Sequence, residues 1–144
     1  MKGFFLLVLC LILLSCFEQG DCSDYSSNIM QVNFYSVDKK QKTVLIDSIK
    51  MEGWDTVMYK NKSLSKIILP LNPATDTMTY HFYYQTLHDT LGISYQRKTF
   101  ALAPGCKVIE ILTIVKTASP ANRKATINQP ELTSNVTENI RFYF

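Results

Sequence analysis

The chain has 144 residues, of which 47% are hydrophobic and 19% are charged, and its formal net charge at pH 7 is +3. This composition is typical of a globular protein, and the length fits one domain with a sizeable core. The basic residues are scattered except for a short cluster at Lys39, Lys40 and Lys42, which we interpret as a solvated hairpin turn. Without a basic stripe interleaved with aromatic residues, we expect no nucleic-acid partner.

The first 15 residues have the layout of a lipoprotein signal peptide. Lys2 is followed by an unbroken apolar run of 11 residues, 4–14, and then by Ser15 and Cys16. As a helix this run would be ~16 Å long, too short for a hydrocarbon core of ~30 Å. We therefore expect cleavage before Cys16, palmitate-type acylation of its thiol, and a lipid anchor in the bacterial cell envelope, at the outer membrane. The alternative is an ordinary secretory signal cleaved elsewhere, although no small-x-small site lies nearby.

Cleavage would leave a chain of 129 residues with a polar N-terminal segment. Lys2 is the only charged residue before Cys16, so its removal lowers the net charge to +2. Residues 16–28 contain several Ser, Asp and Glu residues and too few apolar residues to form a core. We expect residues 1–15 to be the signal peptide, residues 16–28 the acylated cysteine and its tether, and residues 29–144 one folded domain.

The four cysteines divide between these segments. Cys10 is lost with the signal peptide and Cys16 is acylated, so Cys22 and Cys106 remain in an oxidising compartment. We expect these two to form a disulfide, which closes an 85-residue loop and contributes at most about 4 to 5 kcal/mol in the chain-entropy model. The alternatives are two free thiols or a metal-binding pair, but two ligands are too few for a tight zinc site.

Beyond the tether, apolar and polar residues alternate with a period of two, which is typical of antiparallel β-strands. Met30, Val32 and Phe34 alternate with polar neighbours, and another run ends with Ile49 and Met51 before a glycine. Further runs are expected at 56–59 and 64–71. Pro70 cannot donate a ladder hydrogen bond, so it marks a sheet edge or the end of a strand.

The second half of the chain contains the clearest strand, residues 78–84, which places alternate aromatic side chains on one face. We expect a four-residue turn at 86–89 and a return strand at 91–95. Residues 108–115 are nearly all apolar, which predicts a central strand buried on both faces, and 118–128 is expected to be a loop. A last alternating run ends at Phe144. About eight short strands predict an all-β fold, an antiparallel β-sandwich that is immunoglobulin-like or similar.

Several short motifs also resemble a known family. The residues that carry the resemblance are Ser65-Lys66-Ile67-Ile68-Leu69-Pro70-Leu71-Asn72-Pro73, Asp76-Thr77, Asp89-Thr90-Leu91, Tyr95 and Cys106. Together they resemble a family of small Bacteroidota lipoproteins of unknown function, the DUF6452 type. The resemblance implies an envelope lipoprotein that works beside an outer-membrane protein, and it supplies no catalytic residues.

The sequence contains no motif of a common catalytic site. Gly-x-Ser-x-Gly, Gly-rich phosphate-loop, His-Glu-x-x-His and Cys-x-x-Cys patterns are all absent. The two histidines, His81 and His88, would approach each other in the predicted hairpin, with Asp89, Asp76 or Glu110 nearby. Surface histidines and turn aspartates also occur for solubility and turn geometry alone. We therefore expect no enzyme, no cofactor and no metal, and keep a hydrolase or metal-dependent enzyme as a remote alternative.

Two aromatic residues are candidates for ligand binding. Trp54 follows Gly53 in a predicted turn, and Tyr83 points away from the predicted core face. Exposed aromatic rings can cover the faces of sugars, and they are also common at protein interfaces. The alternative is structural, with Trp54 closing one end of the sandwich and Tyr83 pairing across strands. We predict a non-catalytic binding or accessory subunit, with an outer-membrane protein as partner; the second hypothesis is a glycan-binding or small-ligand-binding module.

Overall fold

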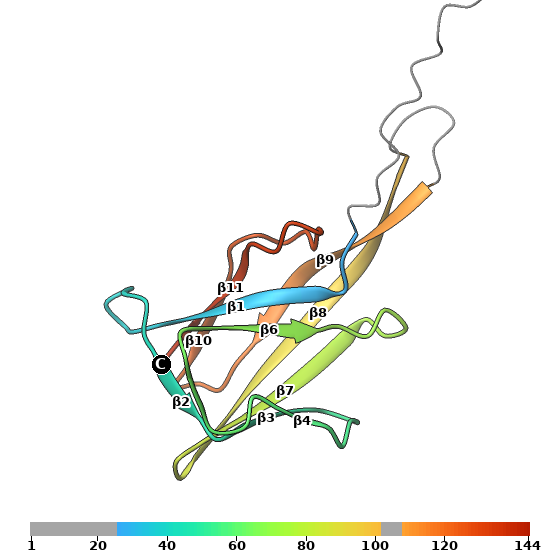
Figure 1. Cartoon of the computed structure of the whole chain (residues 1–144). Coiled ribbons are helices and arrows are strands. Elements are labelled where there is room, and N and C mark those ends of the chain that lie inside the picture. The colour runs from blue at the N-terminus through green and yellow to red at the C-terminus, as the bar shows by residue number, and fades with distance from the viewer. Residues whose placement is uncertain (1–25, 102–107) are drawn as a thin grey trace, which may run out of the picture.

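A computed structural model of the chain describes residues 26–101 and 108–144. All regular structure in these residues is β-strand, arranged as two facing sheets with a small third sheet at one end (Figure 1). The all-β prediction is therefore confirmed, with a sandwich-like architecture. Cys16, Cys22 and Cys106 lie outside the described residues, so the lipidation and disulfide predictions are not addressed by the fold.

The first sheet contains both the first and the last strand of the described chain. In spatial order it contains β10 (Lys124–Ile127), β11 (Glu138–Tyr143), β1 (Ile29–Tyr35) and β6 (Lys66–Pro70). β1 and β11 pair in parallel, whereas the other two pairs are antiparallel. A bulge between Gln31 and Val32 interrupts the parallel pair, and the Gln31 amide donates instead to Asn139 Oδ1 at 2.8 Å. Asn139 is buried, and its side chain satisfies a backbone group that the bulge would otherwise leave unpaired.

The second sheet is fully antiparallel. In spatial order it contains β4 (Val57–Met58), β3 (Ser48–Met51), β7 (Thr77–Tyr84), β8 (Leu87–Ala101) and β9 (Val108–Ala118). The long β8–β9 hairpin extends beyond the other strands in Figure 1. A separate pair is formed by β2 (Val44–Ile46) and β5 (Lys62–Leu64).

The core lies between the two main sheets, where the alternation predicted from the sequence places its apolar residues. Met30, Val32 and Phe34 of β1 are fully buried. Across the sandwich, the Phe82 ring lies 6.3 Å from that of Phe34 and 5.5 Å from that of Phe142. Such edge-to-face and tilted contacts between aromatic rings join the two sheets directly.

The structure contains eleven strands in its described residues rather than about eight, because several strands have only two or three residues. It also corrects the predicted turn at 86–89. Tyr84 pairs with Leu87, so the connection is only two residues long, with Gln85 at a φ of 52°. His88 and Asp89 consequently lie in β8 and not in a turn.

Two further predictions were wrong. β9 is the last strand of its sheet and not a central strand. Its apolar run is explained by residues 130–132, which bond along its free edge: the Leu132 amide donates to the Leu112 carbonyl at 2.9 Å, and the Ile114 amide donates to the Pro130 carbonyl at 2.8 Å. The predicted loop at 118–128 contains strand β10.

Candidate ligand-binding groove

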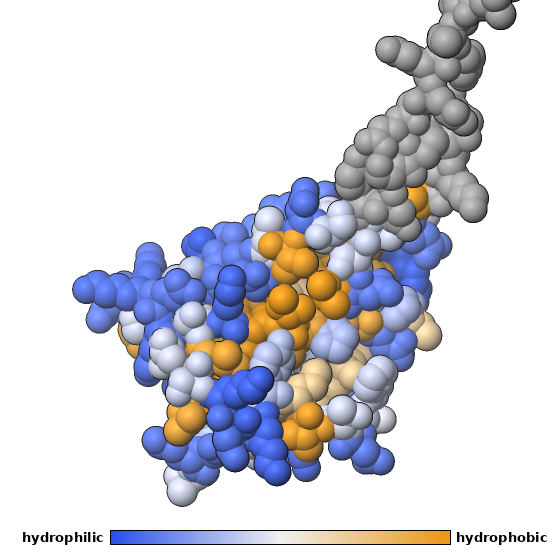
Figure 2. All heavy atoms as spheres, in the orientation of Figure 1, coloured by the Kyte–Doolittle hydropathy of each residue, from blue (hydrophilic) through white to orange (hydrophobic). Residues whose placement is uncertain are grey.

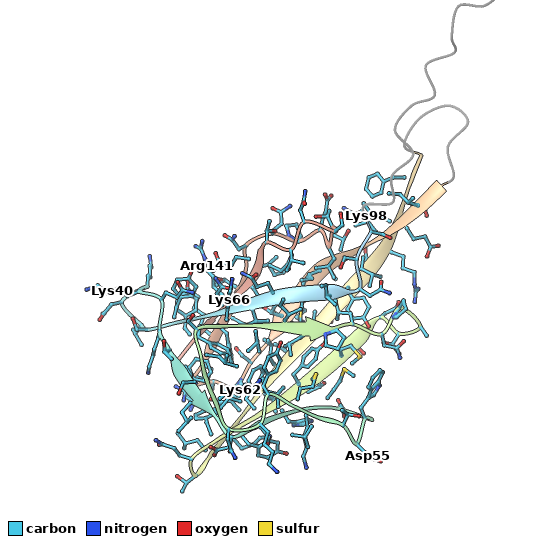
Figure 3. All side chains as sticks on the ribbon, in the orientation of Figure 1. Lys40, Asp55, Lys62, Lys66, Lys98 and Arg141 are labelled. Atoms are coloured by element: carbon cyan, nitrogen blue, oxygen red, sulfur yellow. The ribbon has the colours of Figure 1, made fainter. Side chains whose placement is uncertain are left out.

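Trp54 stands on the turn between β3 and β4. Gly53, with a φ of +77°, occupies a conformation that favours glycine, and the Trp54 amide donates to the Met51 carbonyl at 3.0 Å. Half of the Trp54 residue surface is exposed, and Trp54 is not part of the buried core. Its neighbour Asp55 lies at the outer end of this turn in Figure 3. The indole is therefore held by a defined turn while much of it faces solvent.

A hollow of about 320 Å³ lies beside Trp54. Its lining is mainly polar and consists of Glu52, Gly53, Trp54, Asn72, Thr75, Thr77, Met78 and Thr79. Thr77 and Thr79 face outward because Met78 and Tyr80, which alternate with them on β7, point into the core. The strand that builds the core thus also supplies the outward hydroxyl groups of this hollow.

A second, more open hollow of about 500 Å³ begins at Thr77. It is lined by Asp76, Thr77, Ser94, Tyr95, Gln96, Arg97 and Val115. Arg97 Nη1 lies 3.4 Å from Asp76 Oδ1, and Arg97 Nε donates to the Pro73 carbonyl at 2.9 Å. These bonds fix the guanidinium at the groove wall. We call the two hollows that share Thr77 the Trp54 groove.

Tyr83 is not part of the Trp54 groove. The Glu52 amide donates to the Thr79 carbonyl, so Thr79 is the residue of β7 that lies beside the Trp54 turn. Tyr83 is four residues further along β7, which is about 13 Å in an extended strand. Tyr83 pairs with His88 in the ladder, and the two rings stack at 4.7 Å. This contact is the cross-strand packing that we considered as the structural alternative for Tyr83.

The titratable residues near the predicted hairpin do not form one site. Asp89 is buried, and Arg123 Nε donates to its Oδ2 at 2.6 Å. Asp76 pairs with Arg97 in the groove, and Glu110 is exposed on β9 opposite Thr99. Within 26–101 and 108–144, no group of three or more His, Cys, Asp or Glu residues could hold a metal ion.

The sequence indicated the histidine pair but not two other features. The first is Arg97, whose place in the groove depends on its bonds to the loop at 73–76. The alternate spacing of Thr75, Thr77 and Thr79 was the one sequence signal that could have indicated the groove. The second is a network on the outer face of the first sheet. There Tyr35 donates to Glu138 Oε1 at 2.6 Å, and this hydrogen bond raises the pKa of Tyr35.

A second surface lies at the end of the domain formed by β2, the β1–β2 loop and the β7–β8 turn. Hollows of about 390 and 260 Å³ flank Arg123 and Phe144 there. Val37, Leu45 and Leu87 are exposed at this end, together with lysines of the linings. We call it the basic–apolar end; Figure 3 shows Lys40 projecting from the same loop.

Fold and groove together define a sandwich-like all-β domain with an open groove along β7 and β8 of its five-stranded sheet. The profile of a Family of unknown function (DUF6452) matches residues 43–144, and the chain belongs to this family. The resemblance noted in the sequence is thereby confirmed at the level of the family. No curated protein and no solved structure matches the chain. No helix in the described part of the chain is long and apolar enough to cross a membrane.

Proposed function

We propose that this chain is a non-catalytic binding subunit, held in the cell envelope by a lipid on Cys16, and that its Trp54 groove binds a saccharide. The observation that carries the proposal is the exposed indole of Trp54 at the mouth of a polar hollow. An indole offers a flat apolar surface to the C–H face of a sugar ring, while neighbouring polar groups fix its orientation.

The chemistry of the lining supports a saccharide over an apolar ligand. Threonine hydroxyls both donate and accept hydrogen bonds, Asn72 and Gln96 add amides, and Glu52 adds an acceptor carboxylate. Arg97, already fixed by Pro73 and Asp76, contributes a positive charge beside the second hollow. These groups match a ligand that carries many hydroxyl groups, and because Glu52 and Asp76 stand against the single Arg97, the groove does not select for an acidic ligand.

Trp54→Ala tests the groove. Because Trp54 is half exposed, we expect the variant to keep its stability within about 1 kcal/mol and to lose saccharide binding. The full chain is first screened on a glycan array, and hits are then titrated by fluorescence. Trp54 is the only tryptophan, so its emission reports on this site alone.

Leu45→Ala is the matched control, because Leu45 is 49% exposed and Trp54 is 50% exposed, and Leu45 lies on β2 away from the groove. We expect Leu45→Ala to bind saccharide as the unchanged chain does. No bound glycan on the array, or equal binding by Trp54→Ala, would reject the saccharide proposal. A large loss of stability in Trp54→Ala would instead support a packing role.

The anchor part of the proposal is tested separately. Metabolic labelling with a palmitate analogue should mark the full chain and should not mark Cys16→Ala. The proposed Cys22–Cys106 disulfide has its own test. Titration of the denatured, unreduced, lipidated chain should find no free thiol; two reactive thiols would contradict the pairing.

A second candidate function, an accessory subunit of an outer-membrane protein, is favoured by the basic–apolar end. β1 runs from the side of the β8–β9 hairpin toward this end, so the first residue of β1, Ile29, and the exposed Val37, Leu45 and Leu87 lie at opposite ends of the domain (Figure 1). Exposed apolar residues with polar neighbours are found at protein interfaces.

Affinity purification from detergent-solubilised envelopes tests this candidate. A stoichiometric outer-membrane protein should accompany the lipidated chain and be lost with Leu87→Glu, whereas Trp54→Ala should retain it. Recovery of the chain without such a protein, or a partner unaffected by Leu87→Glu, would reject the accessory role at this surface. The saccharide proposal is independent of that result.

A further inference from the structure

The two histidines of the chain meet on the outer face of the five-stranded sheet. His81 on β7 and His88 on β8 are diagonal neighbours, because His81 pairs with Thr90 and His88 pairs with Tyr83. Long or aromatic side chains in such diagonal positions can reach each other. Here His81 Nδ1 lies 3.2 Å from His88 Nε2, and the two rings are inclined by only 14°.

From this geometry we propose that His81 and His88 form a bidentate site for a divalent transition-metal ion, with Cu²⁺ bound most tightly. Imidazole is a preferred ligand of copper, nickel and zinc, and the usual order of affinities places Cu²⁺ first. The proposal concerns a site outside the Trp54 groove and does not depend on saccharide binding.

The separation of the two nitrogens suits one shared ion. Metal–imidazole bonds of about 2.0–2.1 Å that start from nitrogens 3.2 Å apart meet at an angle of about 100°, between square-planar and tetrahedral values. Each ring must turn by about 40°, because the lone pair and the N–H now face each other along the line between the two nitrogens. The donor ring moves its proton to its other nitrogen, so two neutral rings bind the ion without losing a proton.

The surroundings leave the pair accessible. His88 is exposed and His81 is half buried, so water can complete the coordination shell. Tyr83 stacks on His88 at 4.7 Å and covers one face of that ring, while the ring edge that carries Nε2 faces His81. Lys50 on β3 is the neighbouring cation, with its Nζ 5.7 Å from the centre of the Tyr83 ring, and its charge opposes binding of a metal ion.

A site with two protein ligands is weaker than a structural zinc site, which has four. The described residues add no third His, Cys, Asp or Glu ligand to the pair. The advantage over a single surface histidine is chelation, because once one imidazole holds the ion the second binds it intramolecularly. Loss of either histidine should therefore weaken binding by about a hundredfold.

The test is a calorimetric titration of the full chain with Cu²⁺, with its cysteines alkylated and without a histidine tag. We expect one ion per chain, about hundredfold weaker binding in His81→Gln and in His88→Gln, and tighter binding in Lys50→Gln. Thr90→Ala, which changes a neighbour of the pair that is not a proposed ligand, should bind as the unchanged chain does. Circular dichroism checks that each variant is folded.

A second measurement needs no variant. Because the chain has only two histidines, substoichiometric Cu²⁺ should broaden both of their C2-proton NMR signals together. Broadening of one signal alone, or of neither, would overturn the proposal. So would Cu²⁺ binding that persists in the His81→Gln/His88→Gln double variant, because the ion would then lie elsewhere.

Discussion

Tyr80 illustrates how much one residue contributes to this fold. Its side chain is fully buried, its hydroxyl donates to the Pro70 carbonyl, and burial raises its pKa well above the usual value of about 10. The neutral phenol is thus favoured in the folded state. Below pH 10, the pKa of tyrosine in the unfolded chain, Tyr80 makes its full contribution to the free energy of unfolding. This contribution is lost as the pH rises from 10 through the higher pKa of the folded state, because the unfolded chain then ionises first.

We predict that Tyr80→Phe costs about 1 kcal/mol of unfolding free energy at pH 7, because the Pro70 carbonyl loses its donor. Above pH 10 the unchanged chain should lose up to about 1.4 kcal/mol per pH unit from Tyr80, so the gap to the variant should close. Urea unfolding at pH 7 and pH 11 measures both values. Tyr83→Phe, which removes an outer-face hydroxyl, is the control, and a gap that is constant with pH would contradict the prediction.

Ionic contacts between residues far apart in the sequence could not be predicted. Arg123 and Asp89 are 34 positions apart, and the bond between them depends on the path of the chain between β9 and β10. In the sequence Asp89 looked like a turn residue, because aspartate favours turns. The arginine also lies 5.1 Å from the centre of the Phe144 ring, so the buried carboxylate, the cation and an aromatic ring form one cluster. The groove shows the same limit: Trp54 was recognisable beside Gly53, whereas Arg97 reaches the groove only through tertiary structure.

At the scale of elements, the edge strand β6 shows how the fold limits self-association. The Tyr59 hydroxyl donates to the Ile68 carbonyl at 2.7 Å and accepts from the Ile68 amide at 2.9 Å, so it occupies two groups that a strand of another molecule would need. Pro70 offers no amide, and its carbonyl accepts from Tyr80. Apolar residues gather over this region in Figure 2, and Ile68 itself is 41% exposed.

Tyr59→Phe should therefore leave the backbone amide and carbonyl of Ile68 free to pair with a strand of another molecule. We predict concentration-dependent dimers or larger species by analytical ultracentrifugation, and a loss of about 1 kcal/mol in unfolding free energy. A second change, Ile68→Lys, places a charge on the same strand and should restore the monomer in the double variant. A Tyr59→Phe protein as monomeric as the unchanged chain would show that the hydroxyl is not what blocks this edge.

The elements that were predicted and those that were missed differ in what specifies them. β1, β7 and the buried half of β8 alternate strictly between apolar and polar residues, so one sheet face is encoded locally. β4, with two residues, is too short to show a period, and β10 exists because β11 lies beside it. β9 was placed wrongly because a strand covered by a loop segment has the same apolar pattern as a central strand.

At the scale of the whole molecule, the parallel pairing of β1 with β11 joins the beginning and the end of the domain. No local pattern predicts this pairing, because alternation identifies a strand but not its neighbour. β11 lies between β10 and β1, and its Ile140 and Phe142 are fully buried. The first sheet is therefore incomplete until the last residues of the chain are in place, and contacts so distant in sequence favour slow folding.

Two fragments test this dependence and the predicted domain boundary together. We predict that residues 26–144 unfold cooperatively in urea, whereas residues 26–137 show no cooperative transition and bind a hydrophobic dye. The shorter fragment loses two fully buried apolar side chains, each contributing about 1.5–3 kcal/mol, as well as every ladder bond of β11, against a total stability of about 5–15 kcal/mol. A cooperative transition in 26–137 would mean that β11 only covers a sheet already stable without it. Failure of 26–144 to fold would instead place part of the domain before residue 26.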